Sequence, residues 1–260
     1  MTIEVSCAAR GRYHRYAAPL LQSLVAHRGG QDLHVHYLHG ADLRRRARNR
    51  LERIAEGAIT FHEIADERVS GLPVRDYFTP AMWYRILLPE LVAAPRVLYL
   101  DVDTLVLDDL SALWATDLDE WAAAVPNIWL PDHLFHAQEL GIAPADYFNS
   151  GVLLLDLDAF RRENVADALR ATARARGERG WPDQDALNLV LAGRWQRLDP
   201  RWNTMNSYWL SDDDPALVMA REHPGIRHFE GPGPNKPWQR GARPAHADAW
   251  RQALKASRQV

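Results

Sequence analysis

Short apolar runs alternate along this chain with longer amphipathic stretches. The runs of strand length cover residues 3–8, 33–38, 59–64, 96–100, 121–125 and 152–155. Stretches with the apolar period of a helix lie between the first runs and again over 80–91, 182–191 and 247–256. Strands that alternate with helices are typical of βαβ units. The pattern therefore predicts the α/β class, with a mainly parallel central sheet flanked by helices.

The length of the chain and its even composition bear on domain organisation. Its 260 residues, 47% of them apolar, are enough for one large core or two small ones. Internal repeats, low-complexity segments and linkers are absent from the sequence. We therefore predict a single domain over residues 1–260.

Charge and cysteine content exclude several classes of protein. A formal net charge of -3 gives no sequence-wide basic field, so a nucleic-acid partner is not expected. The single cysteine, Cys7, excludes an internal disulfide and suits a reducing compartment. No apolar run reaches the length of a bilayer, and the N-terminus lacks the layout of a signal peptide. We predict a cytoplasmic protein without a stable membrane anchor, and the sequence does not set its oligomeric state.

Two acidic residues follow the apolar run 96–100. Asp101 and Asp103 are two positions apart, and side chains at that spacing in extended backbone point to the same side. Two like charges in one volume favour a divalent cation, which would bridge them to diphosphate oxygens and neutralise both. For these two residues alone, a solvated turn at a strand end is the alternative interpretation.

Three other segments place polar side chains where a strand ends or a helix starts. They are Asn149 with Ser150, Asp183 with Gln184, and the stretch 228–238, HFEGPGPNKPW. Ligands of open parallel sheets bind at the carboxyl ends of the strands, so distant segments can meet there. His228 would complete with Asp101 and Asp103 a ligand set suited to manganese or magnesium. Lys236 would supply a point charge for a diphosphate; a structural histidine and an exposed lysine are the alternatives.

Together these motifs resemble the retaining glycosyltransferases of family 8, the group of lipopolysaccharide galactosyltransferases and glycogenin. The matching strings are MWYRILLPEL, VLYLDVDTLV, YFNSGVLLLDL, WPDQDALN and HFEGPGPNKPW, in the family's order and at approximately its spacing. The resemblance implies a GT-A fold with a nucleotide-binding part over about 1–110 and an acceptor-side part, with the C-terminal loop and helix, over about 111–260.

The resemblance also implies an activity and a set of site residues. The activity is metal-dependent transfer of a hexose from a nucleotide-sugar, usually a UDP-sugar, to a hydroxyl acceptor such as a saccharide or a small-molecule glycoside. The implied metal is manganese, with magnesium as the alternative, bound by Asp101, Asp103 and His228. The implied donor contacts, besides the two aspartates, are Ala8, Tyr13 on the base, Arg85, the Val102 backbone, Asn149, Ser150, Asp183, Gln184, Gly231 and Lys236. Asn149, Asp183 and Gln184 are the catalytic candidates around the transferred sugar.

The chemistry of the residues limits the mechanism. Departure of a diphosphate from an anomeric carbon leaves charge on phosphate, which a metal and Lys236 would stabilise. Gln184 offers only an amide oxygen, a poor covalent nucleophile, so we expect the acceptor to enter on the same face as the departing diphosphate. Asp183 would orient sugar hydroxyls, and its action as a nucleophile stays open.

The sequence departs from the family pattern at two places. Arg10 and Arg12 stand where the family commonly has acidic or amide residues before the aromatic, so uridine specificity is not fixed. Asn127 stands where relatives have an acidic acceptor contact, so the acceptor is not identified.

Two other functions compete with this interpretation. YLDVDTLV also fits a haloacid-dehalogenase-like phosphatase, with Asp101 as nucleophile, Asp103 as acid/base and the acidic run Asp212, Asp213 and Asp214 on the metal. That motif normally opens its domain, whereas a hundred residues precede it here. A non-catalytic sugar-nucleotide-binding protein is the other alternative, which the complete DVD and DQD motifs and His228 argue against.

Overall fold

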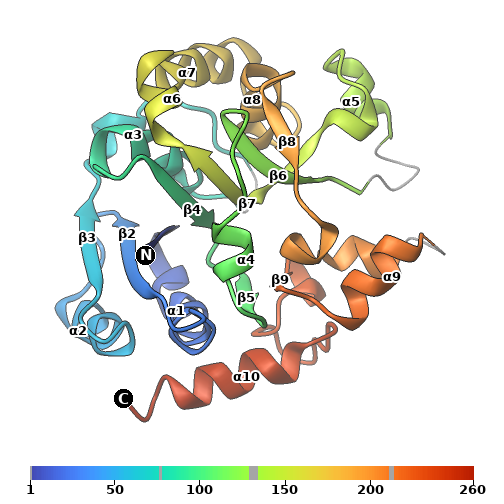
Figure 1. The fold of residues 1–260 in the computed structure, drawn as a ribbon. Helices are drawn as coiled ribbons and strands as arrows, with labels where there is room; N and C mark the ends of the chain where they lie inside the picture. Colours follow the sequence, from blue (N-terminus) through green and yellow to red (C-terminus); the bar gives the residue numbers. More distant parts are fainter. Residues whose placement is uncertain (1, 76–77, 129–133, 211–213) are drawn as a thin grey trace.

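The computed structural model describes residues 2–75, 78–128, 134–210 and 214–260. Within them, seven strands form one sheet in the order β3-β2-β1-β4-β7-β6-β8, and β5 pairs with β9 in a separate ribbon (Figure 1). The strands are β1 (Thr2–Ala9), β2 (Asp32–His39), β3 (Ile59–Glu63), β4 (Arg96–Leu100), β5 (Thr104–Val106), β6 (Ala122–Pro126), β7 (Phe148–Asp156), β8 (Trp195–Arg197) and β9 (Ile226–His228). The α-helices are α1 (Ala17–Ala26), α2 (Arg45–Ile54), α3 (Leu88–Leu91), α4 (Ser111–Trp114), α5 (Leu134–Glu139), α6 (Leu157–Arg162), α7 (Val165–Arg176), α8 (Pro182–Val190), α9 (Pro215–Glu222) and α10 (Ala247–Ala256).

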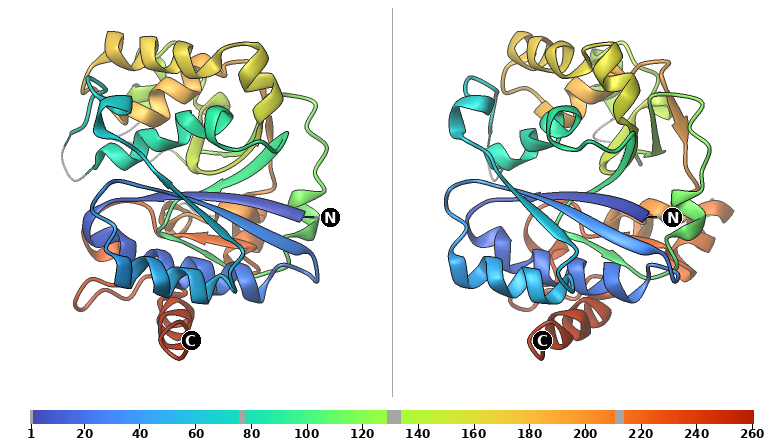
Figure 2. Two further views of the ribbon diagram at one scale, coloured as in Figure 1. Left: turned by 90° about the vertical axis from the view of Figure 1, so that its left-hand side faces the viewer. Right: turned by 60° about the vertical axis from the view of Figure 1, so that its left-hand side comes forward.

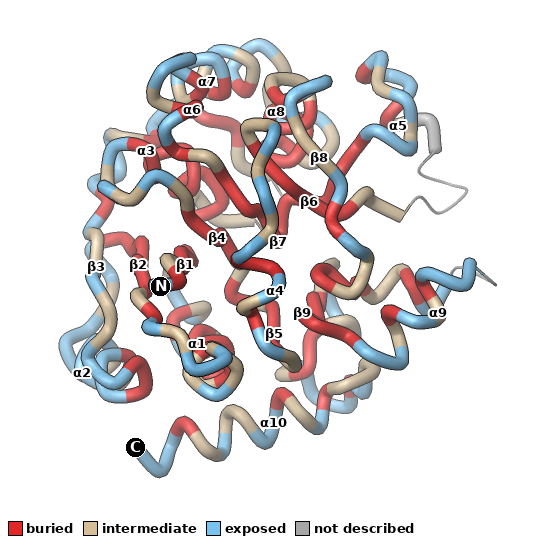
Figure 3. Tube along the Cα trace, in the orientation of Figure 1, coloured by how far each residue is buried: buried red, intermediate tan, exposed pale blue. Residues whose placement is uncertain are grey.

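Helices cover both faces of the sheet, as the views in Figure 2 show. On one face, α1 and α2 pack Leu20, Leu24 and Leu51 against strand residues such as Val5 and Val35. The opposite face packs against α6, α7, α8 and the 3₁₀ helix Pro80–Leu87. Because the central strands are covered on both sides, most of their residues are apolar, and Figure 3 shows them largely buried. The predicted α/β class with a mainly parallel sheet is confirmed.

β7 runs against its neighbours in the sheet. β1 is parallel to β2 and β4, and β6 is parallel to β8, whereas β7 is antiparallel to β4 and β6. The start of β7 therefore lies at the same edge as the carboxyl end of β4. The Asp101 N–H donates to the Gly151 carbonyl across this edge, at 2.8 Å. The reversal places Asn149 and Ser150 beside the two aspartates.

Asp101 and Asp103 lie in a turn, so the extended backbone predicted for them was wrong, although both carboxylates face one volume as predicted. Both the backbone N–H and the hydroxyl of Thr104 donate to the Asp101 carbonyl, at 3.1 and 2.8 Å, and close a turn between β4 and β5. β5 then pairs antiparallel with β9, with Thr104 opposite His228. This ribbon returns the late histidine to the aspartates.

The helix expected over 80–91 divides into the 3₁₀ helix Pro80–Leu87 and one α-helical turn, α3. Pro89 has no N–H to donate to the Arg85 carbonyl, so an α-helix cannot continue unbroken through this position. Arg85 is buried in this segment, with 4% of its surface exposed.

Candidate active site

A cavity of about 520 Å³ opens at the carboxyl edge of the sheet. Its walls come from the ends of β1 and β4, the start of β7, the first turn of α8 and the loop after β9. Every residue with a role predicted from the sequence lines it: Ala8, Tyr13, Arg85, Asp101, Val102, Asp103, Asn149, Ser150, Asp183, Gln184, His228, Gly231 and Lys236. The structure thus brings the candidates together, while their individual roles stay predictions.

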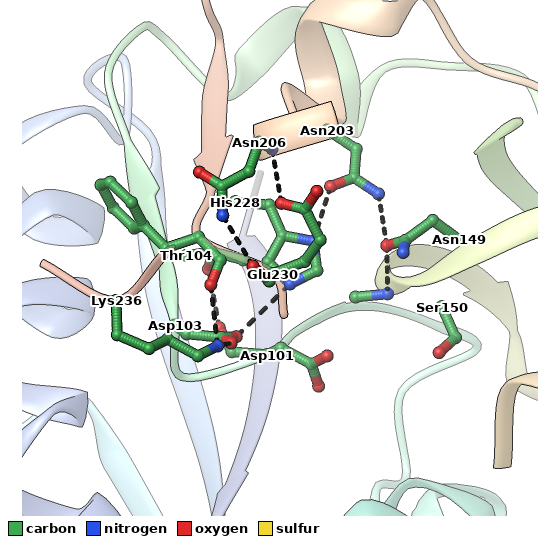
Figure 4. Close-up of polar contacts among 12 residues, drawn as sticks. Asp101, Asp103, Thr104, Asn149, Ser150, Asn203, Asn206, His228, Glu230 and Lys236 are labelled. Atoms are coloured by element: carbon green, nitrogen blue, oxygen red, sulfur yellow. Dashed lines mark hydrogen bonds and ion pairs between the residues drawn. The ribbon is translucent and has the colours of Figure 1, made fainter. Parts of the chain in front are cut away.

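Asp101, Asp103 and His228 form a compact cluster at one end of the cavity (Figure 4). One ligand atom from each residue lies within 4.8 Å of the others. The His228 Nε2 atom is 3.4 Å from Asp103 Oδ1, and the imidazole is almost fully buried. Two carboxylates and an imidazole fit a divalent metal. The cluster is therefore a candidate metal site.

Lys236 provides a second positive charge at this end. Its ammonium forms an ion pair with Asp103 and donates to the Phe229 carbonyl at 2.7 Å. Burial acts to raise the Asp103 pKa, but the neighbouring Lys236 and His228 outweigh it and hold that pKa well below its usual range. Asp103 is therefore ionised throughout the neutral range.

Arg85 links Asp101 of the metal cluster to Asp183, and all three residues line the cavity. Its Nη2 atom lies 2.9 Å from Asp101 Oδ1 and 3.2 Å from Asp183 Oδ2, and Nη1 donates to the Ser150 carbonyl. The guanidinium also stacks over the Tyr99 ring, 4.3 Å from its centroid. Burial alone would lower the Arg85 pKa, but the neighbouring Asp101, Tyr99 and Asp183 raise it. Arg85 is therefore a fixed cation shared by two carboxylates.

Asp183 is buried in the first turn of α8, where the sequence predicts it. Burial raises its pKa to about 6, and the charge of Arg85 offsets only part of this effect. The pKa of Asp183 is thus within reach of physiological conditions.

The orientation of the side-chain amide of the next residue, Gln184, is fixed by its hydrogen-bond partners. The Ser150 N–H donates to Gln184 Oε1 at 2.9 Å. The Gln184 Nε2 group donates to the Tyr147 hydroxyl at 3.2 Å, and that hydroxyl donates to the fully buried Asp185 at 2.6 Å. Since a backbone N–H can only donate, the oxygen of Gln184 must face β7.

The wall near Tyr13 contains Arg10, one of the two arginines that depart from the family pattern. The Tyr13 ring meets Tyr16 edge-on, with centroids 5.6 Å apart. Arg10 lines the cavity, and its two terminal nitrogens lie 2.6 and 3.0 Å from the Asp66 carboxylate. Arg12 is exposed and lies outside the cavity lining. Asp66 thus compensates the charge of Arg10.

The loop after β9 approaches the cavity through Gly231. Its φ of +80° is in the region that favours glycine, and a Cβ there would lie 2.7 Å from the Asn235 amide. Gly233, two residues further along the same loop, does not line the cavity.

Two further polar residues support the site, although the sequence predicts no role for either. Asn203 is fully buried and hydrogen-bonds both His228 and Asn149 (Figure 4). The Glu230 carboxylate accepts from the backbone N–H groups of Asn206 and Ser207 and so fixes a wall of the cavity. Both come from irregular segments, where periodicity gives no guide.

The metal-binding acids that a phosphatase would need come from the run 212–214, of which the structure describes Asp214 alone. Asp214 caps α9 by accepting from the Ala216 N–H at 2.9 Å. Asp212 and Asp213 lie outside the described residues.

Solved structures define the class to which this fold and site belong. The galactosyltransferase LgtC, in complex with donor and acceptor sugar analogs, superposes with a TM-score of 0.85 and 26% identity. The similarity covers 98% of this chain and 96% of that chain. The class is therefore that of LgtC-like GT-A glycosyltransferases.

Sequence comparison identifies the family. The model for glycosyl transferase family 8 matches residues 4–242, so the chain belongs to glycosyltransferase family 8, a family of retaining hexosyltransferases. General stress protein A of Bacillus subtilis (strain 168) is 30% identical over 207 residues, which are 74% of this chain and 71% of that protein. Lipopolysaccharide 1,2-glucosyltransferase of Escherichia coli (strain K12) is 28% identical over 197 residues, and the chain spans 56% of its length. The family match overturns the phosphatase interpretation.

Among the described residues, no helix combines the length and apolar character needed to cross a bilayer.

Proposed function

We propose that this chain transfers a hexose from a nucleotide-sugar, specifically a UDP-sugar, to a hydroxyl group of a saccharide or small-glycoside acceptor, with manganese as the metal. The observation that carries the proposal is a single cavity lined by two different groups of polar side chains. Asp101, Asp103 and His228 form one group in its lining, the metal end, and Asp183 with Gln184 forms an adjacent group, the sugar end, which Arg85 joins to the first. The names of two relatives, a galactosyltransferase and a glucosyltransferase, support a hexose as the transferred group.

The metal end is suited to a leaving diphosphate. Asp101, Asp103 and His228 would hold the ion, with magnesium as the alternative to manganese, and the bound ion would supply Lewis-acid stabilisation of charge on phosphate. Lys236 now compensates Asp103. With an ion on that carboxylate, the lysine is free to donate to phosphate oxygens, beside the Gly231 backbone.

The other end is suited to a sugar. Asn149 and Asp183 both line the cavity and would hydrogen-bond sugar hydroxyls. Gln184 would place its amide oxygen near the anomeric carbon, where it stabilises developing positive charge. Because an amide oxygen is a poor nucleophile and Asp183 is paired with Arg85, we favour front-face attack, with a phosphate oxygen taking the acceptor proton. A covalent route through Asp183 is the alternative.

The nucleoside would occupy the wall formed by Ala8, Tyr13 and Val102. The base would stack on Tyr13, and the ribose would lie near the Val102 backbone. In this proposal residues 1–260 form one domain, with the nucleotide-binding part over about 1–110.

A thermal-shift panel tests the proposal directly. UDP, CDP, GDP, ADP and their hexose derivatives are each added with manganese and, in parallel, with EDTA. A ligand that binds only the folded state raises the melting temperature. We expect UDP and a UDP-hexose to raise the melting temperature in manganese but not in EDTA. No shift with any nucleotide would contradict the proposal, and binding without donor turnover would favour a non-catalytic binding protein.

A further inference from the structure

The residues that would bind the metal are connected to the interior by a chain of hydrogen bonds. The chain starts at the backbone of β7 and passes through the side chains of Asn149 and Asn203 to His228 (Figure 4). Asn203 has no exposed surface, and His228 and Asn149 are almost fully buried. Bulk water therefore does not compete for these bonds.

The direction of every bond in this chain follows from its first donor. The Gly151 N–H can only donate, and it lies 3.0 Å from Asn149 Oδ1. That atom is therefore the amide oxygen, and its second partner, 2.9 Å away, must be the Nδ2 group of Asn203. The remaining atom of the Asn203 amide is its oxygen, which lies 3.0 Å from His228 Nδ1.

An amide oxygen cannot donate, so the proton in this last bond must belong to His228. A histidine with a proton on Nδ1 is left with Nε2 as its ligand atom. Nε2 is the nitrogen that faces the carboxylates, 3.4 Å from Asp103 Oδ1. The chain of amides thus leaves the metal-facing nitrogen of His228 able to offer its lone pair.

The backbone of β7 also makes room for the imidazole ring. A Cβ on Gly151 would lie 2.2 Å from Cε1 of His228 and 2.7 Å from its Nδ1. The φ of Gly151 is not in the left-handed region, so glycine is required here for space and not for backbone conformation. One residue therefore supplies both the first donor of the chain and the surface on which the ring lies.

We propose that Asn203 is a positioning residue that holds His228 with its proton on Nδ1 and Nε2 toward the metal, with Gly151 providing the space for the ring. The inference rests on the metal role proposed above for His228. Asn203 also has a second effect. Its Nδ2 group donates to the Asn149 side-chain oxygen and holds that oxygen toward the protein interior. The Asn149 amide nitrogen is then the group left for a ligand in the cavity that this residue lines.

Manganese affinity is the first test, measured by the electron paramagnetic resonance signal of free Mn²⁺, with Mn²⁺ alone and again with UDP. Asn203→Leu has a similar volume but no acceptor, and we expect its Mn²⁺ affinity to fall about 10–100-fold. Asn203→Asp keeps an acceptor for Nδ1–H and should lose less than the leucine variant. Asn188→Leu is the matched control, since Asn188 is also a buried asparagine bonded to β7 but contacts Phe148 and Gln184 instead. It should keep the wild-type Mn²⁺ affinity.

The protonated nitrogen of His228 is the second test, read in the metal-free protein. Long-range ¹H–¹⁵N correlation spectra identify which imidazole nitrogen carries the proton, and loss of a signal in His228→Gln assigns it. We expect Nδ1 to be protonated in the wild type and Nε2 to be the nitrogen that shifts when Zn²⁺ is added. In Asn203→Leu the proton should redistribute between the two nitrogens. An unprotonated Nδ1 in the wild type would overturn the proposal.

Gly151→Ala shows whether both residues act through the same ring. Because each substitution displaces His228, the double variant Gly151→Ala/Asn203→Leu should lose about as much Mn²⁺ affinity as the worse single variant. Wild-type Mn²⁺ affinity in folded Asn203→Leu would refute the role of Asn203. Neither Mn²⁺ binding without UDP nor the spectra require a donor or turnover. The results of these two measurements would hold even if no nucleotide-sugar were a substrate. That outcome would overturn the proposed function and not the role of Asn203.

Discussion

Asp103 and Asp183 each lie beside a cation in the lining of one cavity, yet their pKa values move in opposite directions. Lys236 and His228 hold the Asp103 pKa below its usual range, whereas burial raises that of Asp183 to about 6. The difference lies in how the positive charge is shared. Asp103 has Lys236 as its own partner, while Asp183 shares Arg85 with Asp101. Asp103 is therefore ionised throughout the neutral range, whereas Asp183 protonates near pH 6.

The largest effect is expected from the permanently charged acid. Asp103→Asn keeps the size of the side chain but removes a metal ligand and leaves Lys236 unpaired. Turnover should fall by about 10³-fold or more, since stabilisation of the leaving diphosphate is lost. Release of UDP from a UDP-hexose in manganese measures this. Asp108→Asn, which breaks a partly exposed ion pair with Arg201, should leave turnover unchanged. Near wild-type turnover in Asp103→Asn would remove that carboxylate from the site.

The shared cation should matter most for folding. Arg85→Met leaves two carboxylates without their partner, and loss of one member of a buried ion pair costs about 3–5 kcal/mol of stability. The free energy of unfolding, measured in urea at pH 7.5, should fall by that amount and by less at pH 5, where Asp183 is protonated. Arg197→Met breaks the exposed pair with Asp146 and serves as the control with little change. Equal effects of the two substitutions would contradict the buried role of Arg85.

The sugar end should affect turnover without affecting nucleotide binding. Gln184→Ala removes the amide oxygen that Ser150 and Tyr147 orient. We expect turnover of the UDP-hexose to fall about 10²-fold, while the affinity for UDP, measured by calorimetry in manganese, stays at the wild-type value. Gln196→Ala, at a partly exposed glutamine that accepts from the Asp119 backbone N–H, is the matched control. Unchanged turnover in Gln184→Ala would exclude it from catalysis.

The smallest effect is the pH dependence that Asp183 imposes. If ionised Asp183 accepts from sugar hydroxyls, turnover should fall about tenfold per pH unit below about pH 6. The stability effect has the opposite sign, because a carboxyl pKa raised on folding means that ionisation destabilises the native state. Between the ordinary pKa of 3.8 and about 6, stability from this group is lost as the pH rises. Asp183→Asn should therefore stabilise the metal-free protein above pH 6 and flatten the acid side of its residual pH profile.

The sequence predicts which residues form the site better than it predicts how those residues are arranged. Apolar runs and helical periods predict the α/β sheet, and residue types at strand ends and in the first turn of α8 identify Asp101, Asp103 and Asp183. The extended geometry expected for Asp101 and Asp103 is wrong because Thr104 closes a turn on the Asp101 carbonyl. What brings the acids together with His228 is the pairing of β5 with β9, a long-range contact that no local pattern encodes.

The residues that sequence reasoning missed act through other side chains. Asn203 and Tyr147 matter through bonds to His228 and Gln184, and Glu230 matters through the backbone of Asn206 and Ser207. Tyr147 and Glu230 fall inside the strings YFNSGVLLLDL and HFEGPGPNKPW, but those strings assign them no role, and Asn203 lies in no motif. The sequence likewise does not show that Arg10 is paired with Asp66. Because of this pair, Arg10 brings no uncompensated charge to the cavity.

The most direct test of the central claim is turnover of UDP-hexoses by the wild-type protein in manganese and in EDTA. The hydroxyl acceptor is supplied as a panel of simple saccharides, and both UDP release and the anomeric configuration of the product are followed by NMR. The account predicts manganese-dependent consumption of at least one UDP-hexose and a product that keeps the configuration of the donor. Full activity in EDTA, or a product with inverted configuration, would contradict it.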